Sequence, residues 1–133
     1  MTTKTATIRQ MCDQFDVTPR TLRFYETKEL LSPKREGQKR IYSKRDRARL
    51  KLILRGKRFG FSLEEIRQLL DLYHMEGGQA AQLSQTYDLA KIHLANMQAK
   101  RTELDEAIAE LTGQMNMASE KLAQINKGKS AVF

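Results

Sequence analysis

The sequence contains no tryptophan, a single cysteine and only two prolines. The lone thiol of Cys12 cannot form a disulfide within the chain, so a disulfide-stapled fold is excluded. An iron–sulfur cluster is excluded as well, because its thiolate ligands are missing. The two histidines, His74 and His93, lack the HxxH or HxxxH spacing of a metal-binding pair, so we predict no metal and no cofactor.

Long hydrophobic runs are also missing. No stretch approaches the roughly 18 uncharged apolar residues of a membrane-spanning helix, so we expect no membrane partner. Residues 1–6 have no apolar core of the secretory kind, which predicts a cytoplasmic protein. The sequence also lacks a nucleophile–base set, paired carboxylates and a phosphate-binding loop. We therefore expect no enzyme and name no catalytic residue.

The chain does carry positive charge, and one half of it holds the whole excess. The formal net charge is +8 over 133 residues. Residues 1–70 carry 18 Lys and Arg against 8 Asp and Glu, a net of +10, whereas residues 71–133 carry 6 against 8, a net of −2. A basic half favours a polyanionic partner, because cations that displace condensed counterions from phosphate gain free energy. The alternative is an ordinary solvated basic surface.

Helix starts are well marked in the first half. Thr18 followed by Pro19 is a cap and a first-position proline, which predicts a helix through about Thr27. In a capping box, a Ser or Thr hydroxyl accepts from the backbone amide three residues later, and that residue's side chain accepts in return. Three such boxes predict helix starts at residues 7–10, 43–46 and 62–65.

Two short helices joined by a tight turn at residues 16–17 have the shape of a helix-turn-helix, whose second helix enters the major groove. Leu22 should anchor this second helix in the core. Arginine can bind guanine or phosphate, and threonine and tyrosine hydroxyls can donate to phosphate oxygens. Tyr25 has the alternative of packing between helices. The residues that we expect to contact DNA here are Thr18, Arg20, Thr21, Arg23 and Tyr25.

Residues 30–42 change character and predict a small β-hairpin, with a turn at residues 35–38. A basic hairpin beside a helix-turn-helix is a wing, which can touch flanking phosphates or enter the minor groove. The wing carries Lys34, Arg35, Lys39, Arg40 and Tyr42.

The second half follows one pattern, in which apolar residues recur alternately every three and four positions. This seam runs from Ala80 to Ile125, with Arg101 as its one charged interruption. A single long helix with an apolar stripe facing water is marginal, so it needs a partner, most simply the same helix of a second copy. Leu89, Ile92 and Ala95 form a second stripe that can rest on the globular half of either subunit. We assign dimerisation to Leu94, Met97, Leu104, Ile108, Leu111, Met115 and Leu122.

The predicted fold is therefore all-α with a small β-hairpin wing. It comprises a winged helix-turn-helix over residues 1–76, a coiled-coil dimerisation helix over residues 79–126 and a flexible tail over residues 127–133.

Several segments, in order, resemble the MerR family of bacterial transcription regulators. They are TI at 7–8, VTPRTLRFYE at 17–26, LLSP at 30–33, RIYS at 40–43 and GFSLEEI at 60–66. Within the family, FDVT at 15–18 and RLKLILRGKR at 49–58 are most similar to regulators of leucine and isovalerate catabolism. The resemblance covers about residues 7–73.

The resemblance implies a homodimer joined by an antiparallel coiled coil. Such proteins bind palindromic operators in double-stranded DNA and bend and untwist the duplex, many of them at promoters occupied by RNA polymerase. By the same resemblance, DNA contacts fall on Arg20, Thr21, Arg23, Tyr25, Arg40 and Tyr42.

The resemblance also limits which class of effector the protein can bind, and where. Metal-sensing members use cysteines beside the start and near the far end of the dimerisation helix, and this chain has none there. Drug-sensing members carry a ligand domain after the coil, for which the few residues beyond Ile125 are too short. An effector would bind at the coil or near residues 73–87, and the subgroup implies an acyl-coenzyme A.

Two other functions compete with that of a regulator. An architectural, excisionase-like DNA binder uses the same winged fold, but the long seam argues against it. A protein-binding modulator on a MerR-like fold would lose the basic recognition surface, whereas this chain keeps Arg20, Arg23 and Arg40.

Overall fold

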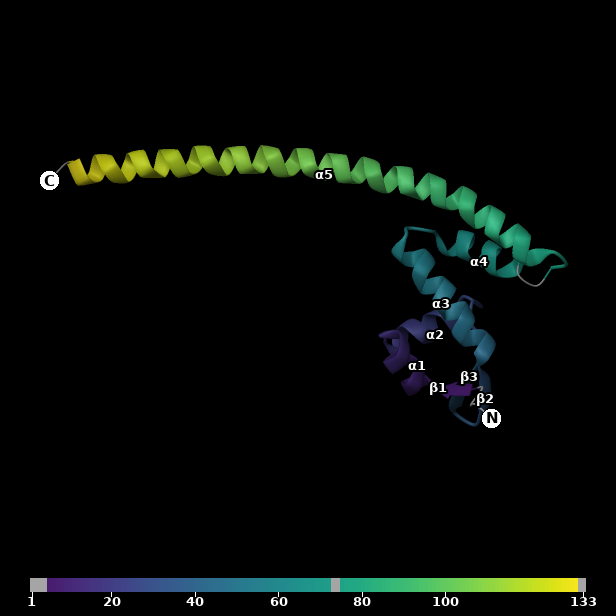
Figure 1. Ribbon diagram of the computed structural model, residues 1–133. Coiled ribbons are helices and arrows are strands. Elements are labelled where there is room, and N and C mark those ends of the chain that lie inside the picture. Colours follow the sequence, from purple (N-terminus) through teal and green to yellow (C-terminus); the bar gives the residue numbers. More distant parts are fainter. Residues whose placement is uncertain (1–4, 73–74, 132–133) are drawn as a thin grey trace. The chain divides into compact units, whose positions relative to one another are not determined.

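A computed structural model describes residues 5–72 and 75–131 of the chain (Figure 1). It divides into an N-terminal unit, Met1–His93, and a C-terminal unit, Leu94–Phe133. The elements follow in the order β1 (Thr5–Thr7), α1 (Ile8–Phe15), α2 (Pro19–Thr27), β2 (Lys34–Glu36), β3 (Lys39–Ser43), α3 (Lys44–Arg58), α4 (Leu63–Leu72) and α5 (Gly78–Ala131). The mostly helical fold with a winged helix-turn-helix and a long last helix is confirmed.

Local side-chain chemistry determines where the helices begin. At α1 the Thr7 hydroxyl accepts from the Gln10 amide at 3.1 Å, and the Gln10 side chain accepts from the Thr7 amide at 2.9 Å. The boxes at α3 and α4 are also formed, and Thr18 caps α2. Asp16 supplies the left-handed turn between α1 and α2, with φ 55°. All four predicted helix starts are confirmed.

The sheet has three antiparallel strands in the order β1-β3-β2. Strand β1 was not predicted, because its three residues pair with the distant β3 and carry no local strand pattern. The hairpin turn occupies only residues 37–38, since Glu36 pairs with Lys39 and Arg35 with Arg40. Gly37 allows this tight turn with φ +63°. The turn is therefore shorter than the predicted one over residues 35–38.

The core lies within the N-terminal unit and draws on each of its elements except the exposed strand β2. A single cluster brings together side chains from the sheet and the short helices. The start of α5 belongs to this unit as well, because Leu89 packs against the cluster and the Gln82 side chain donates to the Leu69 carbonyl at 2.6 Å. The compact unit thus extends past the predicted boundary at residue 76. Its buried apolar residues are Ala6, Met11, Leu22, Tyr25, Leu30, Leu31, Tyr42, Leu50, Ile53, Phe61, Ile66 and Leu70.

Helix α5 has 54 residues and continues to Ala131. The sequence predicted a dimerisation helix over residues 79–126 and a flexible tail over residues 127–133. Residues 127–131 are helical instead, because Lys127 and Lys129 favour a helix and a single glycine, Gly128, is tolerated within one. Residues 132–133 lie outside the described residues. Within the described residues, no helix combines the length and apolar character needed to cross a membrane.

Candidate nucleic-acid interface

Helix α2 turns its cations outward from a buried anchor. Leu22 is fully buried, whereas Arg20 and Arg23 are exposed. The predicted contact Thr18 is exposed at the cap, where its hydroxyl accepts from the Thr21 amide at 3.1 Å and lies 2.9 Å from the Thr21 hydroxyl. The cap and the first two turns of α2 therefore present two guanidinium groups and two hydroxyls.

The two tyrosines predicted to contact DNA are core residues instead. Tyr42 is 0% exposed and Tyr25 only 6% exposed. Tyr25 lies three positions after Leu22, on the same face of α2, and its ring meets Phe24 at 5.7 Å between centroids. Tyr42 pairs across the sheet with Ala6, which is also buried. In this conformation the Tyr42 side chain offers no surface to a duplex and that of Tyr25 offers very little, so we leave both out of the proposed contact set, and their DNA contacts stay predictions.

A carboxylate that the sequence analysis missed joins α2 to the wing. Arg40 Nε donates to Glu26 Oε1 at 2.7 Å, and Arg35 donates from a terminal guanidinium nitrogen to Glu26 Oε2 at 2.9 Å. Partial burial by itself would raise the pKa of Glu26. The hydrogen bonds and charges of Arg40 and Arg35 outweigh that effect and lower the pKa below its ordinary value. We call this three-residue contact the wing clasp.

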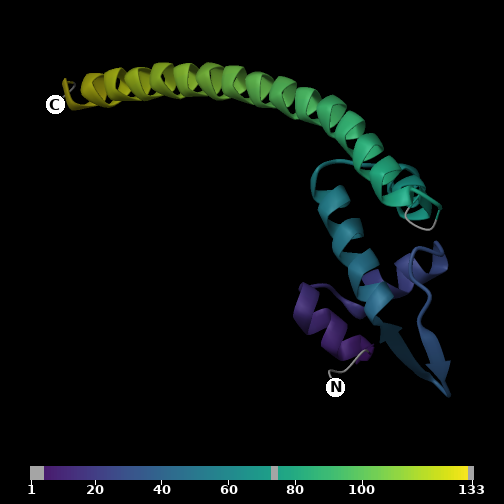
Figure 2. The ribbon, with the colours of Figure 1, turned by 45° about the vertical axis from the view of Figure 1, so that its right-hand side comes forward.

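The hairpin carries two further cations clear of the clasp. Lys34 and Lys39 are exposed on β2 and β3. Figure 2 shows the hairpin extending away from the neighbouring helices to a free tip. Two of the predicted wing cations therefore face solvent, while Arg35 and Arg40 are engaged by Glu26. Sequence proximity could not reveal this, because Glu26 precedes Arg40 by 14 positions.

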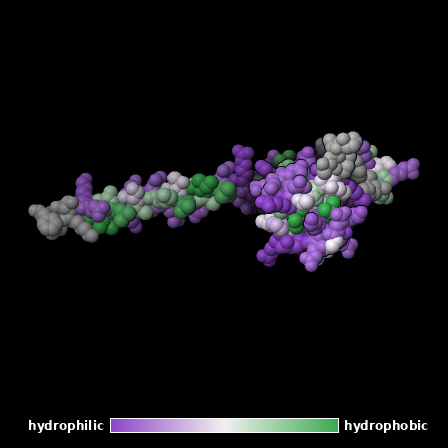
Figure 3. All heavy atoms as spheres, turned by 90° about the horizontal axis from the view of Figure 1, so that it is seen from below, coloured by the Kyte–Doolittle hydropathy of each residue, from purple (hydrophilic) through white to green (hydrophobic). Residues whose placement is uncertain are grey.

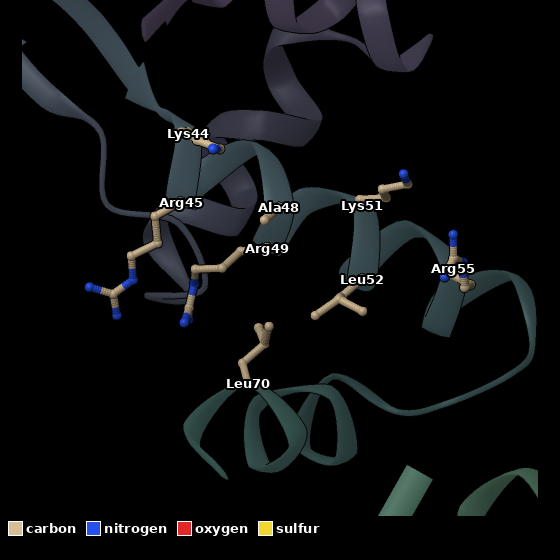
Figure 4. Close-up of a pocket in the computed structure, with 8 residues that line it drawn as sticks. All are labelled: Lys44, Arg45, Ala48, Arg49, Lys51, Leu52, Arg55 and Leu70. Atoms are coloured by element: carbon tan, nitrogen blue, oxygen red, sulfur yellow. The ribbon is translucent and has the colours of Figure 1, made fainter. Parts of the chain in front are cut away.

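Helix α3 adds a cationic groove outside the predicted interface. Figure 4 shows Leu52 of α3 and Leu70 of α4 facing each other across it, with Arg45 and Arg49 extending on the same side. Arg49 also donates to the Leu30 carbonyl at 2.7 Å, and burial together with the charge of Arg45 lowers its pKa. The groove has a volume of about 580 Å³. Its lining is Lys44, Arg45, Ala48, Arg49, Lys51, Leu52, Arg55 and Leu70.

Cys12 is partly buried on the inward face of α1, and burial raises its pKa, with a further increase from Asp13 that Arg23 opposes. Within residues 5–72 and 75–131, no three His, Cys, Asp or Glu side chains are grouped as metal ligands would be. This placement suits Cys12 as a small apolar packing residue.

The predicted dimerisation residues all lie in the C-terminal unit, on α5. Each is exposed in the single chain, from Leu94 to Leu122. Figure 3 shows apolar side chains recurring along this helix between polar ones. An apolar side chain that is exposed on one chain is available to a partner.

Two family models match the chain. The model for the MerR HTH family regulatory protein matches residues 6–72, and the model described as MerR, DNA binding, matches residues 47–114. The chain is 39% identical to the HTH-type transcriptional regulator ZntR of Escherichia coli over 67 residues, which are 49% of this chain and 48% of ZntR. It is 38% identical to the regulator HmrR of Rhizobium leguminosarum over 94 residues, 70% of this chain and 65% of HmrR.

A solved structure is similar over most of the chain. MtaN, the N-terminus of the Bacillus subtilis multidrug transporter activator, is 33% identical and covers 83% of this chain and 97% of its own, with a TM-score of 0.52. The match to the curated relatives spans between about half and two thirds of their length. With each of the two family models matching about half of its residues, this chain belongs to the MerR family.

Proposed function

We propose that this protein is a dimeric, sequence-specific DNA-binding regulator of transcription. The observation that carries the proposal is the outward presentation of Arg20 and Arg23 from the capped start of α2, beside a basic hairpin joined to the same helix by the wing clasp. A rigid helix with cations at its start is the unit that reads a major groove, and a basic wing contacts the flanking backbone.

The chemistry of each side chain indicates which part of the DNA it contacts. Arg20 and Arg23 suit guanine O6/N7 or phosphate, whereas Thr18 and Thr21 suit phosphate oxygens. Lys34 and Lys39 on the wing add backbone contacts. Two copies joined through α5 would read two inverted half-sites. A dimer with fixed spacing can bind such a palindrome only if the duplex bends or untwists, at a cost of about 1–6 kcal/mol. At a promoter, that distortion would act on RNA polymerase.

Selection of bound genomic fragments tests the proposal. Fragments recovered by the purified protein at low salt should share an inverted repeat and lie at promoters. Recovered recombination sites would favour an architectural DNA binder instead. Fragments without inverted-repeat symmetry, or no retained duplex, would remove sequence-specific dimeric binding.

Arg23→Ala should weaken binding to the selected operator by about 1–3 kcal/mol, because one guanidinium contact is lost. Arg9→Ala, which removes an exposed arginine from α1, is the charge-matched control and should change affinity less. Equal losses in both variants, measured by fluorescence anisotropy, would show a uniform charge effect and exclude Arg23 as a specific contact.

The finer proposal is control of branched-chain amino-acid catabolism through an acyl-coenzyme A effector. The groove on α3, and not the coil or residues 73–87 expected from the resemblance, supports it chemically. Arg45, Arg49 and Arg55 suit the phosphates of coenzyme A, and Leu52 and Leu70 suit a short acyl chain. Calorimetric titration with isovaleryl-coenzyme A should give binding that Arg55→Gln weakens and Arg9→Gln does not. Equal binding of unacylated coenzyme A would contradict recognition of the acyl group.

A further inference from the structure

We propose that His93 is a positioning residue that fastens the start of α5 to the corner between α3 and α4. Through that corner it holds Lys57 and Arg58, the last two residues of α3, in place for DNA phosphate. The DNA part of this inference, that Lys57 and Arg58 are positioned for phosphate, rests on the proposed function. The mechanical part, that His93 attaches α5 to the corner between α3 and α4, concerns the N-terminal unit alone.

The imidazole of His93 makes two directed contacts with the corner. Its Nε2 lies 3.1 Å from Oε1 of Glu65, at the start of α4. Its ring stacks on Phe61 with centroids 4.8 Å apart and an angle of 30° between the planes. Only 16% of the His93 side chain is exposed, so these contacts are shielded from water more than a surface ion pair is. Glu65 therefore contacts one edge of the imidazole ring, and Phe61 contacts one of its faces.

Each group that His93 touches is itself part of the corner's structure. Glu65 Oε1 also accepts from the Ser62 amide at 2.8 Å, which closes the capping box of α4. The Phe61 amide donates to the Gly56 carbonyl of α3 at 2.9 Å, and its ring is buried in the core. Loss of His93 would thus loosen a capping residue and a core aromatic at the same time.

His93 lies beside Gly60, whose left-handed backbone favours glycine. Gly60 has φ +91°, and a Cβ built there would lie 3.6 Å from Nδ1 of His93. The Gly60 amide donates to the Lys57 carbonyl at 3.2 Å, so this backbone continues directly from the end of α3. Lys57 and Arg58 are exposed just before it. The imidazole therefore lies beside the backbone that directly follows these two cations.

The electrostatics agree with this geometry. A backbone hydrogen bond from Ser62 lowers the pKa of Glu65, burial opposes it, and the hydrogen bond and charge of His93 lower the pKa further. The nearby charges are engaged with one another, Glu64 with Arg67 on α4 and Asp88 with Lys91 on α5. In the described part of the chain, His93 is the ring that lies within hydrogen-bonding distance of the Glu65 carboxylate.

The mechanical part is tested by amide hydrogen exchange and carboxyl titration in the full chain, without DNA. His93→Ala should speed exchange of the Ser62 amide about threefold to tenfold and raise the pKa of Glu65. His93→Gln, which can still donate to Glu65 but cannot stack or carry charge, should recover part of both effects. Asp88→Asn, which breaks an exposed ion pair on the same helix, is the control and should leave both unchanged. Identical exchange in His93→Ala and wild type would overturn the proposal.

The DNA part is tested with sheared genomic duplex at low salt. His93→Ala should bind about threefold to tenfold more weakly than Asp88→Asn, and the loss should shrink when Lys57 and Arg58 are both replaced by Gln, because the two cations are then no longer there to be positioned. Faster exchange with unchanged DNA affinity would overturn the link to DNA. Failure of the wild type to bind any duplex would remove the proposed function, while the exchange result would still decide the role of His93 within the fold.

Discussion

Tyr42 lies in the core with a hydroxyl that is buried and, among the described residues, makes no hydrogen bond. A buried hydroxyl without a partner costs free energy, because water solvates it in the unfolded chain. Tyr42→Phe should therefore raise the free energy of unfolding by about 1 kcal/mol, as measured by urea denaturation. DNA affinity should stay unchanged. A variant of normal stability that bound DNA more weakly would return Tyr42 to the set of contacts.

Glu26 has a different role, because it competes with phosphate for Arg35 and Arg40. Glu26→Gln removes a negative charge from the interface and releases both guanidinium groups. Binding to non-specific duplex should then tighten, and the slope of log affinity against log salt should steepen by about one to two. The operator should gain less than random DNA, since the wing is no longer held against α2. An unchanged salt slope would exclude competition between Glu26 and phosphate.

The clasp also predicts how acid affects stability. The folded-state pKa of Glu26 lies below its ordinary value of 4.5, so the clasp stabilises the fold above that pH and is lost as pH falls through the folded value. Because Arg35 is half exposed, we expect a contribution of about 1 kcal/mol or less at neutral pH. The difference in unfolding free energy between wild type and Glu26→Gln should shrink as the pH falls below 4.5 and through the lowered folded-state pKa. A difference that stayed constant over this range would mean that the clasp does not titrate.

At the scale of the elements, local chemistry explains what the sequence could predict. Thr7, Thr18, Ser43 and Ser62 cap helices through partners three residues away, and a pattern that short is legible in any sequence. Strand β1 and the clasp of Glu26 depend on residues far along the chain, so no local pattern could reveal them. The burial of Tyr25 could have been predicted, because Tyr25 lies three positions after Leu22 and therefore on the same face of the helix. We predicted a DNA contact instead, because its hydroxyl can donate to phosphate.

The packing of α3 against α4 requires a glycine. A Cβ built at Gly56 would lie 2.9 Å from Cγ1 of Ile66, a buried residue of α4. Gly56→Ala gains about 1 kcal/mol of helix propensity but forces the two helices or the isoleucine to shift, at about 1–3 kcal/mol. We expect net destabilisation of about 1 kcal/mol, measured by urea denaturation. Gly113→Ala on α5 is the matched control, because nothing lies near that position and only the propensity gain remains. A stabilised Gly56→Ala would show that the α3–α4 contact is loosely packed.

At the scale of the whole molecule, the N-terminal unit carries the excess of positive charge, and the C-terminal unit carries an apolar seam. The core residues all belong to the N-terminal unit, whereas the seam residues of the C-terminal unit stay exposed on one chain. The sequence predicted the long helix, because its period of three and four is regular. The direction in which two such helices pair does not follow from that period, since the seam has the same spacing in both directions. The proposed function depends on this pairing, because a single winged helix-turn-helix would bind only one half-site of an operator.

A charge placed in the seam should separate the subunits. Ile108 is a seam residue that is 53% exposed in the single chain, and Ala109 beside it lies off the seam. Ile108→Asp places a carboxylate in the apolar interface of the proposed dimer, where its desolvation is costly. Sedimentation should then show a monomer, and operator affinity should fall steeply because two half-sites are no longer bound together. Ala109→Asp adds the same charge outside the seam and should remain a dimer with normal affinity. If Ile108→Asp sedimented as a dimer, or if both variants were monomers, the helix would not pair through this seam and the palindromic operator would lose its structural basis.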